Sequence, residues 1–546
     1  MKQTNFVKII SKNIVIFLFF LSCLKLNAQI DTTTEKEINF QASKFKYLLE
    51  MATRYYYDSL SYEKVSDAAF HSLLKALDPQ SLYFSKTEYE KLSEANKGES
   101  EGIGIDIVPL QDTLTIISVF KDSPADSAGL LPGDKVLFIN GKSVLSTNKV
   151  DADNLIKGAP GTKVQLIIKR QFNSSALNEY VITRNEFNLP SITAYFLLEK
   201  TNIGYIQITR FSNKTDQELK QALNSLTKNG MSKLIIDLRG NYGGILEATL
   251  KSLEFFLPKG TKLLQIKSHS RDFDTTFYST SEKVFNNLKV AILVDKNSAS
   301  ASEILAGVLQ DYDDAIIVGE RTFGKGTVQR IWQMNDGTAF RLTVAEYITP
   351  SGRKIQKNHD SVSMADLDPS MQLNLNIKTR EEILNTLRQF GGKSQIPVYY
   401  SADNRVILGG GGVFPDIPVT SDTLTLLTRV LIQKGIFLEF IYQFLATERD
   451  KIIQNYNNNF KIFNNTFQIT EEIIKNFKNY SISRNIWNES YFQKDKDYIA
   501  TYLKAIIGYT IWGENAYKLA LLGKDTVFDT AVKSFANYAK ILNKKE

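Results

Sequence analysis

Strand-like and helix-like segments alternate between residues 203 and 319, and this alternation limits the folds that the chain can adopt. The apolar runs Ile203–Ile208, Lys233–Leu238 and Val290–Val294 have the length and composition of buried strands. The segment Asp216–Asn229 carries leucines at helical spacing and ends at a glycine. Because strand, turn and helix recur in this order, we expect an α/β core.

Further segments extend this predicted core around two glycine-containing turns. A second helix is predicted at Ile245–Phe256, and further strands are predicted at Ala315–Val318, Thr327–Trp332 and Phe340–Ile348. The turns are RGNYGG at residues 239–244 and GERTFGKGT at residues 319–327. Glycine turns expose backbone N–H groups and let other groups approach closely, so both turns are candidates for a site.

The first 28 residues have the composition of an export signal. Lys2, Lys8 and Lys12 precede the apolar run Ile14–Leu24, and Ala28 offers a small residue for cleavage. The run has 11 residues, whereas a span of a bilayer needs about 20. We therefore predict cleavage after Ala28 and a periplasmic or otherwise exported protein.

The single cysteine, Cys23, lies inside this signal. Its surroundings loosely resemble a lipoprotein processing site, but no leucine stands three residues before it, so cleavage is preferred to a lipid anchor. Removing residues 1–28 removes four lysines and no acidic residue, which lowers the net charge from +7 to +3. So small an excess gives no reason to expect nucleic acid. Without Cys23 and with only three scattered histidines, we expect no disulfide, no metal and no cofactor.

The length of 546 residues, with 43% hydrophobic and 23% charged residues, indicates a globular chain of several domains. Changes in composition and in predicted secondary structure along the chain mark the domain boundaries. We predict a signal peptide at 1–28, a helical region at 29–97, a β-rich domain at 98–184, the α/β core at 185–420 and a helical region at 421–546. The core contains an irregular insertion at about 355–407 with one helix, Arg380–Phe390. In the last region, Ile436–Leu445 is predicted to be a packed helix rather than a membrane span.

The β-rich domain carries three motifs in a known order. Gly102, Ile103, Gly104 and Ile105 alternate glycine with isoleucine, and SPADSAGLLPGD and VLFINGKSV follow. This order resembles a PDZ domain of the bacterial protease type, a partly open β-barrel. The resemblance implies that backbone N–H groups at 102–105 hold the terminal carboxylate of a peptide. The alternative is a glycine-rich hairpin without a ligand.

Three serines and one lysine in the core are candidates for nucleophilic catalysis. Ser298, Ser300 and Ser302 follow a predicted strand, and Lys325 stands between glycines after the next one. A serine needs a base, and an uncharged lysine can act as one. The alternative is that the serines cap a helix and the lysine is solvated. Nearby acidic and amide residues are expected to be caps or solvated, with Glu303 left open: Asn297, Asp311, Asp313 and Asp314.

The serine stretch and the TFGKGTVQ segment together closely resemble the carboxyl-terminal processing, or tail-specific, serine peptidases. The resemblance implies a ClpP/crotonase-like core in which Ser300 is the nucleophile, Lys325 the general base and Gln329 the residue that orients the lysine. It also assigns the oxyanion hole to the N–H groups of Gly244 and Ala301. The pKa of such a lysine must fall from about 10.4 toward 7 to 8, and Phe323 is expected to supply a dry wall.

Two other functions compete with this one. The segment GERTFGKG resembles a nucleotide-binding loop, but Gly326 stands where that loop needs serine or threonine for magnesium. A PDZ-bearing scaffold with an inactive core is the alternative that stays open. We predict a serine endopeptidase whose protein substrates have free, apolar C-termini. The sequence leaves open the oligomeric state and any association with a membrane surface.

Overall fold

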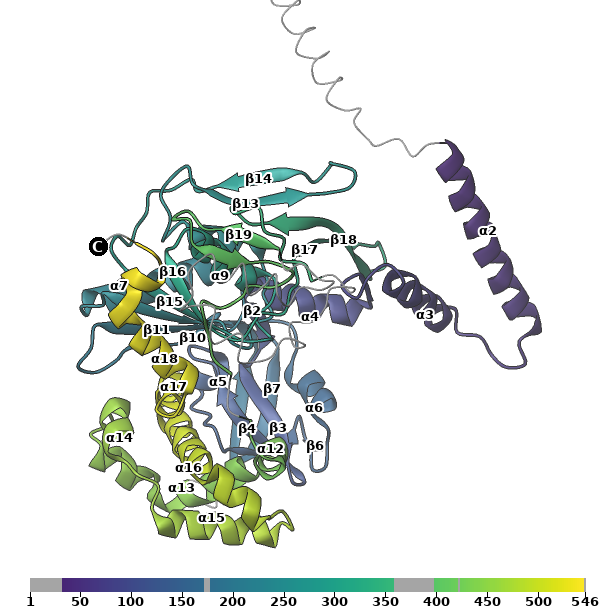
Figure 1. Ribbon diagram of the computed structural model, residues 1–546. Coiled ribbons are helices and arrows are strands. Elements are labelled where there is room, and N and C mark those ends of the chain that lie inside the picture. The colour runs from purple at the N-terminus through teal and green to yellow at the C-terminus, as the bar shows by residue number, and fades with distance from the viewer. Residues whose placement is uncertain (1–31, 171–176, 358–396, 421–422, 545–546) are drawn as a thin grey trace, which may run out of the picture. The chain divides into compact units, whose positions relative to one another are not determined.

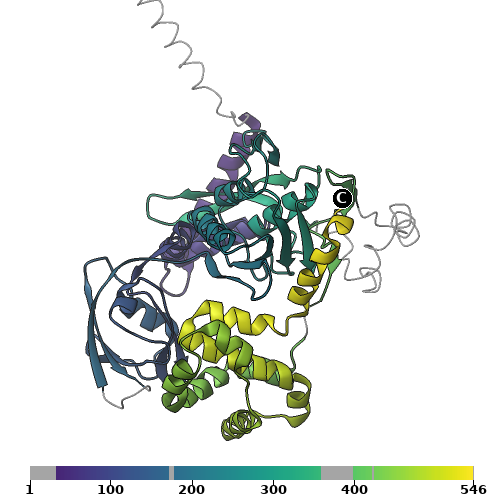
Figure 2. The same ribbon diagram turned by 90° about the vertical axis from the view of Figure 1, so that its left-hand side faces the viewer.

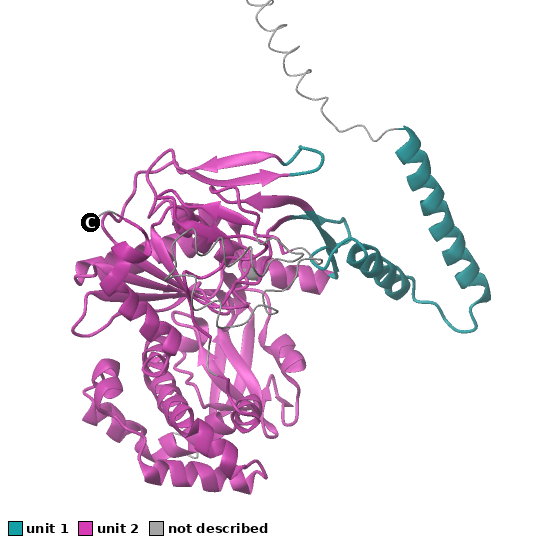
Figure 3. Ribbon diagram, in the orientation of Figure 1, with its two compact units in different colours: residues 1–85, 268–273, 329–343 teal, residues 86–267, 274–328, 344–546 magenta. Residues whose placement is uncertain are grey.

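The structure is a computed structural model that describes residues 32–170, 177–357, 397–420 and 423–544. The chain divides into two compact units, shown in Figure 3. Unit 1 comprises residues 1–85, 268–273 and 329–343, and unit 2 comprises residues 86–267, 274–328 and 344–546. The predicted export signal, Cys23 and the predicted helix Arg380–Phe390 lie outside the described residues.

Unit 1 is built from two helices and a short strand. These are α2 (Thr32–Tyr55), α3 (Tyr62–Lys75) and β1 (Leu82–Phe84). The hydroxyl of Ser61 caps α3 by accepting the N–H of Lys64, and α3 ends before Pro79. Strand β1, which the sequence did not predict, pairs antiparallel with the first residues of β18 (Ala339–Ile348).

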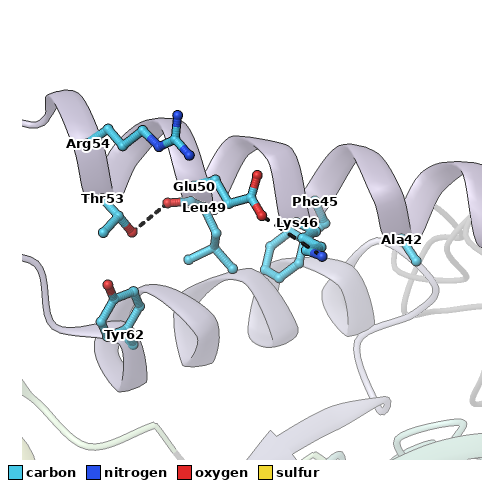
Figure 4. Close-up of a pocket in the computed structure, with 8 residues that line it drawn as sticks. All are labelled: Ala42, Phe45, Lys46, Leu49, Glu50, Thr53, Arg54 and Tyr62. Carbon is cyan, nitrogen blue, oxygen red and sulfur yellow. Dashed lines mark hydrogen bonds and ion pairs between the residues drawn. The ribbon is translucent and has the colours of Figure 1, made fainter.

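Helix α2 has no buried residue, and its apolar side is only partly covered within unit 1. A groove of about 480 Å³ lies beside α2 and reaches Tyr62 at the start of α3. Figure 4 shows Phe45 and Leu49 pointing from α2 toward α3. The groove is lined by Ala42, Phe45, Lys46, Leu49, Glu50, Thr53, Arg54 and Tyr62. Helix α2 therefore contributes little buried area to its unit.

Unit 2 begins with helix α4 (Lys86–Lys97) and a small β domain. Its main sheet has the order β3-β4-β5-β7-β8, with β6 beside β5, while β2 pairs with β9. The elements are β2 (Glu99–Gly102), β3 (Ile105–Leu110), β4 (Thr113–Val119), α5 (Pro124–Ser127), β5 (Lys135–Ile139), β6 (Lys142–Ser143), α6 (Lys149–Ile156), β7 (Lys163–Lys169), β8 (Leu177–Thr183) and β9 (Asn185–Asn188). Alternate residues of these strands form one apolar core.

A six-stranded sheet of order β10-β11-β12-β15-β16-β21 is the centre of unit 2 (Figure 1). All its neighbouring strands are parallel except β10, which runs antiparallel to β11. The strands are β10 (Ile192–Leu197), β11 (Ile203–Ile208), β12 (Lys233–Asp237), β15 (Lys289–Val294), β16 (Ala315–Gly319) and β21 (Ile417–Pro418). Both faces are covered, which explains why β11 and β16 are buried throughout.

Helices from distant parts of the chain cover this sheet. One face is covered by the C-terminal helices α17 (Glu514–Leu522), α18 (Thr526–Ser534) and α19 (Tyr538–Ile541). The sheet residues that pack against them include Tyr205, Ile235, Leu293 and Val318. Three further helices are α7 (Thr215–Lys228), α8 (Leu246–Leu253) and α9 (Ala301–Asp311). Helix α8 packs between α7 and α9, and α9 lies against β16. Because side chains alternate along a strand, the intervening residues face these helices.

The remaining strands lie outside the six-stranded sheet. They are β13 (Lys262–Lys267), β14 (Thr275–Tyr278), β17 (Thr327–Gln333), β18, β19 (Val398–Tyr400) and β20 (Val406–Leu408). Within unit 2, β13 pairs with β14 and with the last residues of β18, Glu346–Ile348. The hairpins β13–β14 and β19–β20 were not predicted, because neither has a strong alternating pattern.

The C-terminal region is helical, as predicted. Its elements are α12 (Leu426–Gln433), α13 (Ile436–Asn455), α14 (Phe460–Thr466), α15 (Glu471–Ser483), α16 (Glu489–Trp512), α17 (Glu514–Leu522), α18 (Thr526–Ser534), η2 (Phe535–Asn537) and α19 (Tyr538–Ile541). Phe437, Ile441 and Leu445 of α13 are buried in one cluster that also takes in Leu110 from the β domain. Figure 2 shows these green and yellow helices beside the blue strands.

No single helix among the described residues is long and apolar enough to cross a bilayer. Helices α12 and α13 meet that test only when taken together, and they are bent by 64° at the break between them.

Candidate active site

The loop between β15 and α9 is fixed by two of its three serines. The Ser298 hydroxyl donates to the Leu238 carbonyl oxygen over 2.9 Å, and the Ser302 hydroxyl donates to the Asn241 carbonyl oxygen over 2.9 Å. Both side chains are fully buried. These two serines therefore join the loop to the end of β12, and their hydroxyl protons are engaged in structural hydrogen bonds.

Ser300 differs from its two neighbours in backbone and surroundings. It precedes α9 with φ 54° and ψ −112°, a conformation that residues other than glycine seldom adopt. The residue is 7% exposed. Strain of this kind persists only where the surrounding structure imposes it, as at a nucleophile.

The carboxylate of Glu303 joins two loops. These are the serine loop, residues 295–300 between β15 and α9, and the lysine loop, residues 320–326 between β16 and β17. Its Oε2 atom accepts the N–H of Ser300 over 2.8 Å and the N–H of Lys325 over 2.9 Å. Its Oε1 atom accepts the N–H of Gly324 over 2.7 Å and the hydroxyl of Thr322 over 2.5 Å. The backbone N–H groups of the predicted nucleophile and of the predicted base thus share one acceptor, Glu303 Oε2. Burial raises the pKa of Glu303, and the four donors oppose that rise.

Glycines allow the lysine loop to pack closely, as predicted. A Cβ atom on Gly326 would lie 2.1 Å from the backbone nitrogen of Gln356, so no larger residue fits there. Lys325 itself is partly buried. The expectation that Phe323 forms a dry wall is wrong, because this side chain is 52% exposed. Gln329 lies on β17 in unit 1, so its place beside Ser300 and Lys325 stays a prediction.

The turn at Gly243 and Gly244 lies against the serine loop. A Cβ atom on Gly243 would lie 2.8 Å from the Ser300 Cβ and 3.0 Å from the Ala301 nitrogen, and Gly243 has φ 99°. Within the described residues, neither the N–H of Gly244 nor that of Ala301 donates a backbone or side-chain hydrogen bond. Two unused N–H groups beside a serine are what an oxyanion hole requires, so the assignment of these two residues stands as a prediction with supporting geometry.

The loop at Gly102–Ile105 has the shape that a carboxylate-binding loop needs. Gly102 and Gly104 have φ 140° and 80°, and a Cβ on Gly104 would lie 2.3 Å from the Ser123 Cβ. The Ile103 side chain is fully buried. In the described part of the chain, the N–H groups of Ile103 and Gly104 donate no hydrogen bond. The loop can therefore offer them to an anion.

Asp311, the last residue of α9, and Asp313, just after it, were expected to be caps or solvated, and that expectation is wrong. Asp311 is 3% exposed and pairs with the fully buried Arg353 over 2.8 Å. Asp313 is fully buried and pairs with Arg405 over 2.8 Å. These pairs could not be predicted, because both arginines lie on segments distant from α9 in the chain. The ion pairs hold the segments around residues 353 and 405 against α9.

One residue of this site, Glu303, was not recognised as functional from the sequence. Glu303 stands three residues after Ser300, the spacing of a capping box, and this signal was available.

Comparison with known proteins decides the family. The model of peptidase family S41 matches residues 202–363, and a PDZ domain model matches residues 115–170. The carboxy-terminal processing protease CtpB of Bacillus subtilis is 33% identical over 347 residues, which cover 63% of this chain and 70% of CtpB. This chain belongs to the carboxy-terminal processing serine proteases of family S41. The predicted family and fold class, an α/β peptidase core with a PDZ domain and a helical C-terminal region, are confirmed.

Two other matches cover less of this chain. Bacillus subtilis CtpA is 35% identical over 303 residues, which span 55% of this chain and 64% of CtpA. The photosystem II D1 C-terminal processing protease is 24% identical, with a TM-score of 0.33 over 58% of this chain and 85% of that chain. A family of unknown function matches residues 427–513, within the C-terminal helices.

Proposed function

We propose that this family member is an exported serine endopeptidase that cleaves proteins recognised by their C-terminal tails. Ser300 is the nucleophile and Lys325 is the general base. The observation that carries the proposal is the Glu303 carboxylate, whose Oε2 atom accepts the backbone N–H groups of both residues. A shared buried acceptor holds a nucleophile and its base in fixed relation.

The reaction proceeds in two stages. Lys325 takes the hydroxyl proton of Ser300 as Oγ attacks the scissile carbonyl carbon. The resulting oxyanion accepts the N–H groups of Gly244 and Ala301. The lysine ammonium then gives its proton to the departing amine, which leaves an acyl-enzyme. Water, deprotonated by the same lysine, releases the acid, and Gln329 orients the lysine amine.

Substrate selection is assigned to the PDZ domain. The unused N–H groups of Ile103 and Gly104 receive the terminal carboxylate of the tail, and the tail adds a strand beside β3. The proposed tails are largely apolar. Export follows from the N-terminal 28 residues, with cleavage after Ala28 favoured over lipidation of Cys23, and N-terminal sequencing of the mature protein is expected to begin at Gln29.

The test is a peptidase assay on purified protein with an apolar-tailed peptide. We expect cleavage by the unmutated protein and none by Ser300→Ala or Lys325→Ala, with all three proteins showing the same thermal unfolding. Tail binding without turnover in the unmutated protein would support the inactive scaffold instead. A matched peptide with an amidated C-terminus should be cleaved more slowly, and equal rates would remove the PDZ domain from substrate selection.

A further inference from the structure

The C-terminal helices contact both the PDZ domain and the peptidase core, and the scheme above gives them no role. We propose that they are a brace that holds strand β3 in a fixed position relative to Ser300, so that cleavage occurs at a set minimum distance from the substrate's C-terminus. This inference rests on the proposed function, because it needs a tail bound beside β3 and cleavage at Ser300. It gives a role to residues 427–513, which match a family of unknown function.

The end of β3 is packed into the helical region. Leu110, the last residue of β3, is buried in one cluster with apolar residues of α12 to α16. Among the described residues, the apolar core of the PDZ domain does not include Leu110. A Cβ atom on Gly435, just before α13, would lie 2.5 Å from Leu110 Cδ2, so the two surfaces fit closely. The strand proposed to receive the tail is therefore anchored at its far end.

A buried carboxylate adds a polar anchor at the same place. The Glu439 Oε2 atom on α13 accepts the side-chain N–H of Gln111, the residue after β3, over 3.0 Å. The same oxygen accepts the hydroxyl of Tyr480 over 2.7 Å and pairs with Arg484 over 3.3 Å. Both of these partners belong to the helical region. They fix the carboxylate in place, so Gln111 meets a preformed acceptor.

The other end of the helical region is fixed to the central sheet. The ring of Phe528 on α18 packs edge-to-face against Tyr205 of β11, with ring centroids 6.0 Å apart. Asp525, which caps α18, pairs with Arg239 over 2.7 Å. Arg239 begins the turn at residues 239–244 that carries half of the proposed oxyanion hole. The brace is thus tied to the part of the core where cleavage is proposed.

Helices α16 and α17 connect these two ends. They meet at Gly513, which caps both helices. A Cβ atom on Gly508 of α16 would lie 3.2 Å from the Ala516 Cβ of α17, so the helices pack closely. Ile507 of α16 lies in the cluster that buries the end of β3, and Leu522 of α17 lies in the cluster on the sheet. Close packing transmits position, so β3 is held relative to the sheet.

A fixed separation between the two sites sets a minimum length of substrate. An extended chain spans at most about 3.3 to 3.6 Å per residue. A tail held beside β3 can therefore present to Ser300 only bonds that lie beyond a certain number of residues from its C-terminus. When the contact at Leu110 is broken, the PDZ domain moves on its remaining linkers, and bonds nearer to the tail come within reach.

The test uses a substrate in which identical cleavable repeats precede one apolar tail, so that sequence preference is equal at every repeat. Cut positions are mapped by mass spectrometry at low conversion with the full-length protein. We expect the unmutated protein to leave the repeats nearest to the tail uncut. Leu110→Asp puts a charge against the helices and should raise cleavage of these near repeats by at least about tenfold. Its affinity for a fluorescent tail peptide should stay within about twofold of wild type.

The matched control is Leu145→Asp, since Leu145 lies in the same domain and is 54% exposed. We expect this variant to keep the wild-type limit.

A second variant applies if Leu110→Asp does not bind the tail peptide. Gln111→Gly removes only the hydrogen bond to Glu439 and suits the φ of 57° at this position. It should raise cleavage of the near repeats by about threefold. Cleavage of the near repeats by the unmutated protein, or an unchanged limit in the variants that bind tails, overturns the proposal. If the unmutated protein cuts no repeat, or Ser300→Ala cuts equally well, the proposed function fails instead.

Discussion

The core and the PDZ domain each have two backbone N–H groups that donate no hydrogen bond within the described residues, and we propose both pairs as anion sites, but the two regions are built differently. In the core, the turn at Gly243 and the serine loop are tied to the lysine loop through Glu303, a fully buried carboxylate with four donors. In the PDZ domain, the loop Gly102–Ile105 owes its shape to positive φ angles at two glycines. The core site should therefore respond sharply to single changes, and the PDZ loop more mildly.

The largest effect is expected for Glu303→Gln. The amide puts an NH₂ group against two of the four donors, so at least one backbone N–H loses its acceptor and the two loops separate. We expect kcat/KM to fall by about 1,000-fold and the free energy of unfolding to fall by about 3 kcal/mol.

The matched control for this change is Glu218→Gln. Glu218 also accepts two backbone N–H groups, those of Ser191 and Ile192, over 2.7 and 2.9 Å. We expect it to lose stability and keep activity. Equal losses of kcat/KM in Glu303→Gln and Glu218→Gln would show that Glu303 does not position the proposed catalytic residues.

A smaller effect is expected for Gly243→Ala. The added Cβ would collide with the Ala299 carbonyl oxygen at 2.7 Å and with the Ser300 Cβ at 2.8 Å, which moves the nucleophile. We expect kcat/KM to fall by about 100-fold. Gly240→Ala in the same turn is the control, since Gly240 also has positive φ but meets nothing within 4 Å. If both variants lose the same activity, backbone strain rather than crowding at Ser300 is the cause.

The PDZ loop is tested by Gly104→Ala. Its Cβ would meet Ser123 at 2.3 Å and distort the loop. We expect cleavage of a tailed protein to slow by about tenfold, while hydrolysis of a small ester stays unchanged. Gly141→Ala in the same domain, with φ 76° and open space around it, should leave both rates unchanged. A loss of ester hydrolysis in Gly104→Ala would contradict the separation of the two sites.

The smallest effects are expected for Ser298→Ala and Ser302→Ala. Each removes a hydrogen bond to a carbonyl oxygen, and Ser298→Ala also removes the acceptor of the Asp295 N–H. We expect losses of about 1 to 2 kcal/mol of stability, and kcat should stay within about tenfold of wild type. Complete loss of activity in either variant, with the fold intact, would reopen the choice among the three serines.

The sequence predicted the core well because its strands and helices are long and strongly patterned. The segments Ile203–Ile208 and Thr215–Lys228 match the predictions to within a residue. Short strands such as β1 were missed, since three residues carry no periodicity.

The residues of the proposed site were predicted to different extents. Ser300 and Lys325 came from motifs, and a contiguous motif can be read without a structure. The pair of Asp311 with Arg353 joins segments far apart in the chain, and no local pattern indicates such a contact. The expected role of Phe323 failed because hydrophobic character alone does not fix burial in a loop.

The central claim, that Ser300 is the nucleophile activated by Lys325, is tested most directly by locating a covalent adduct. The purified protein is treated with a fluorophosphonate, digested and mapped by mass spectrometry. The account predicts one adduct, on Ser300, that forms at least about 100-fold more slowly in Lys325→Ala. An adduct on Ser298 or Ser302, or labelling of Ser300 at the same rate without the lysine, would contradict it.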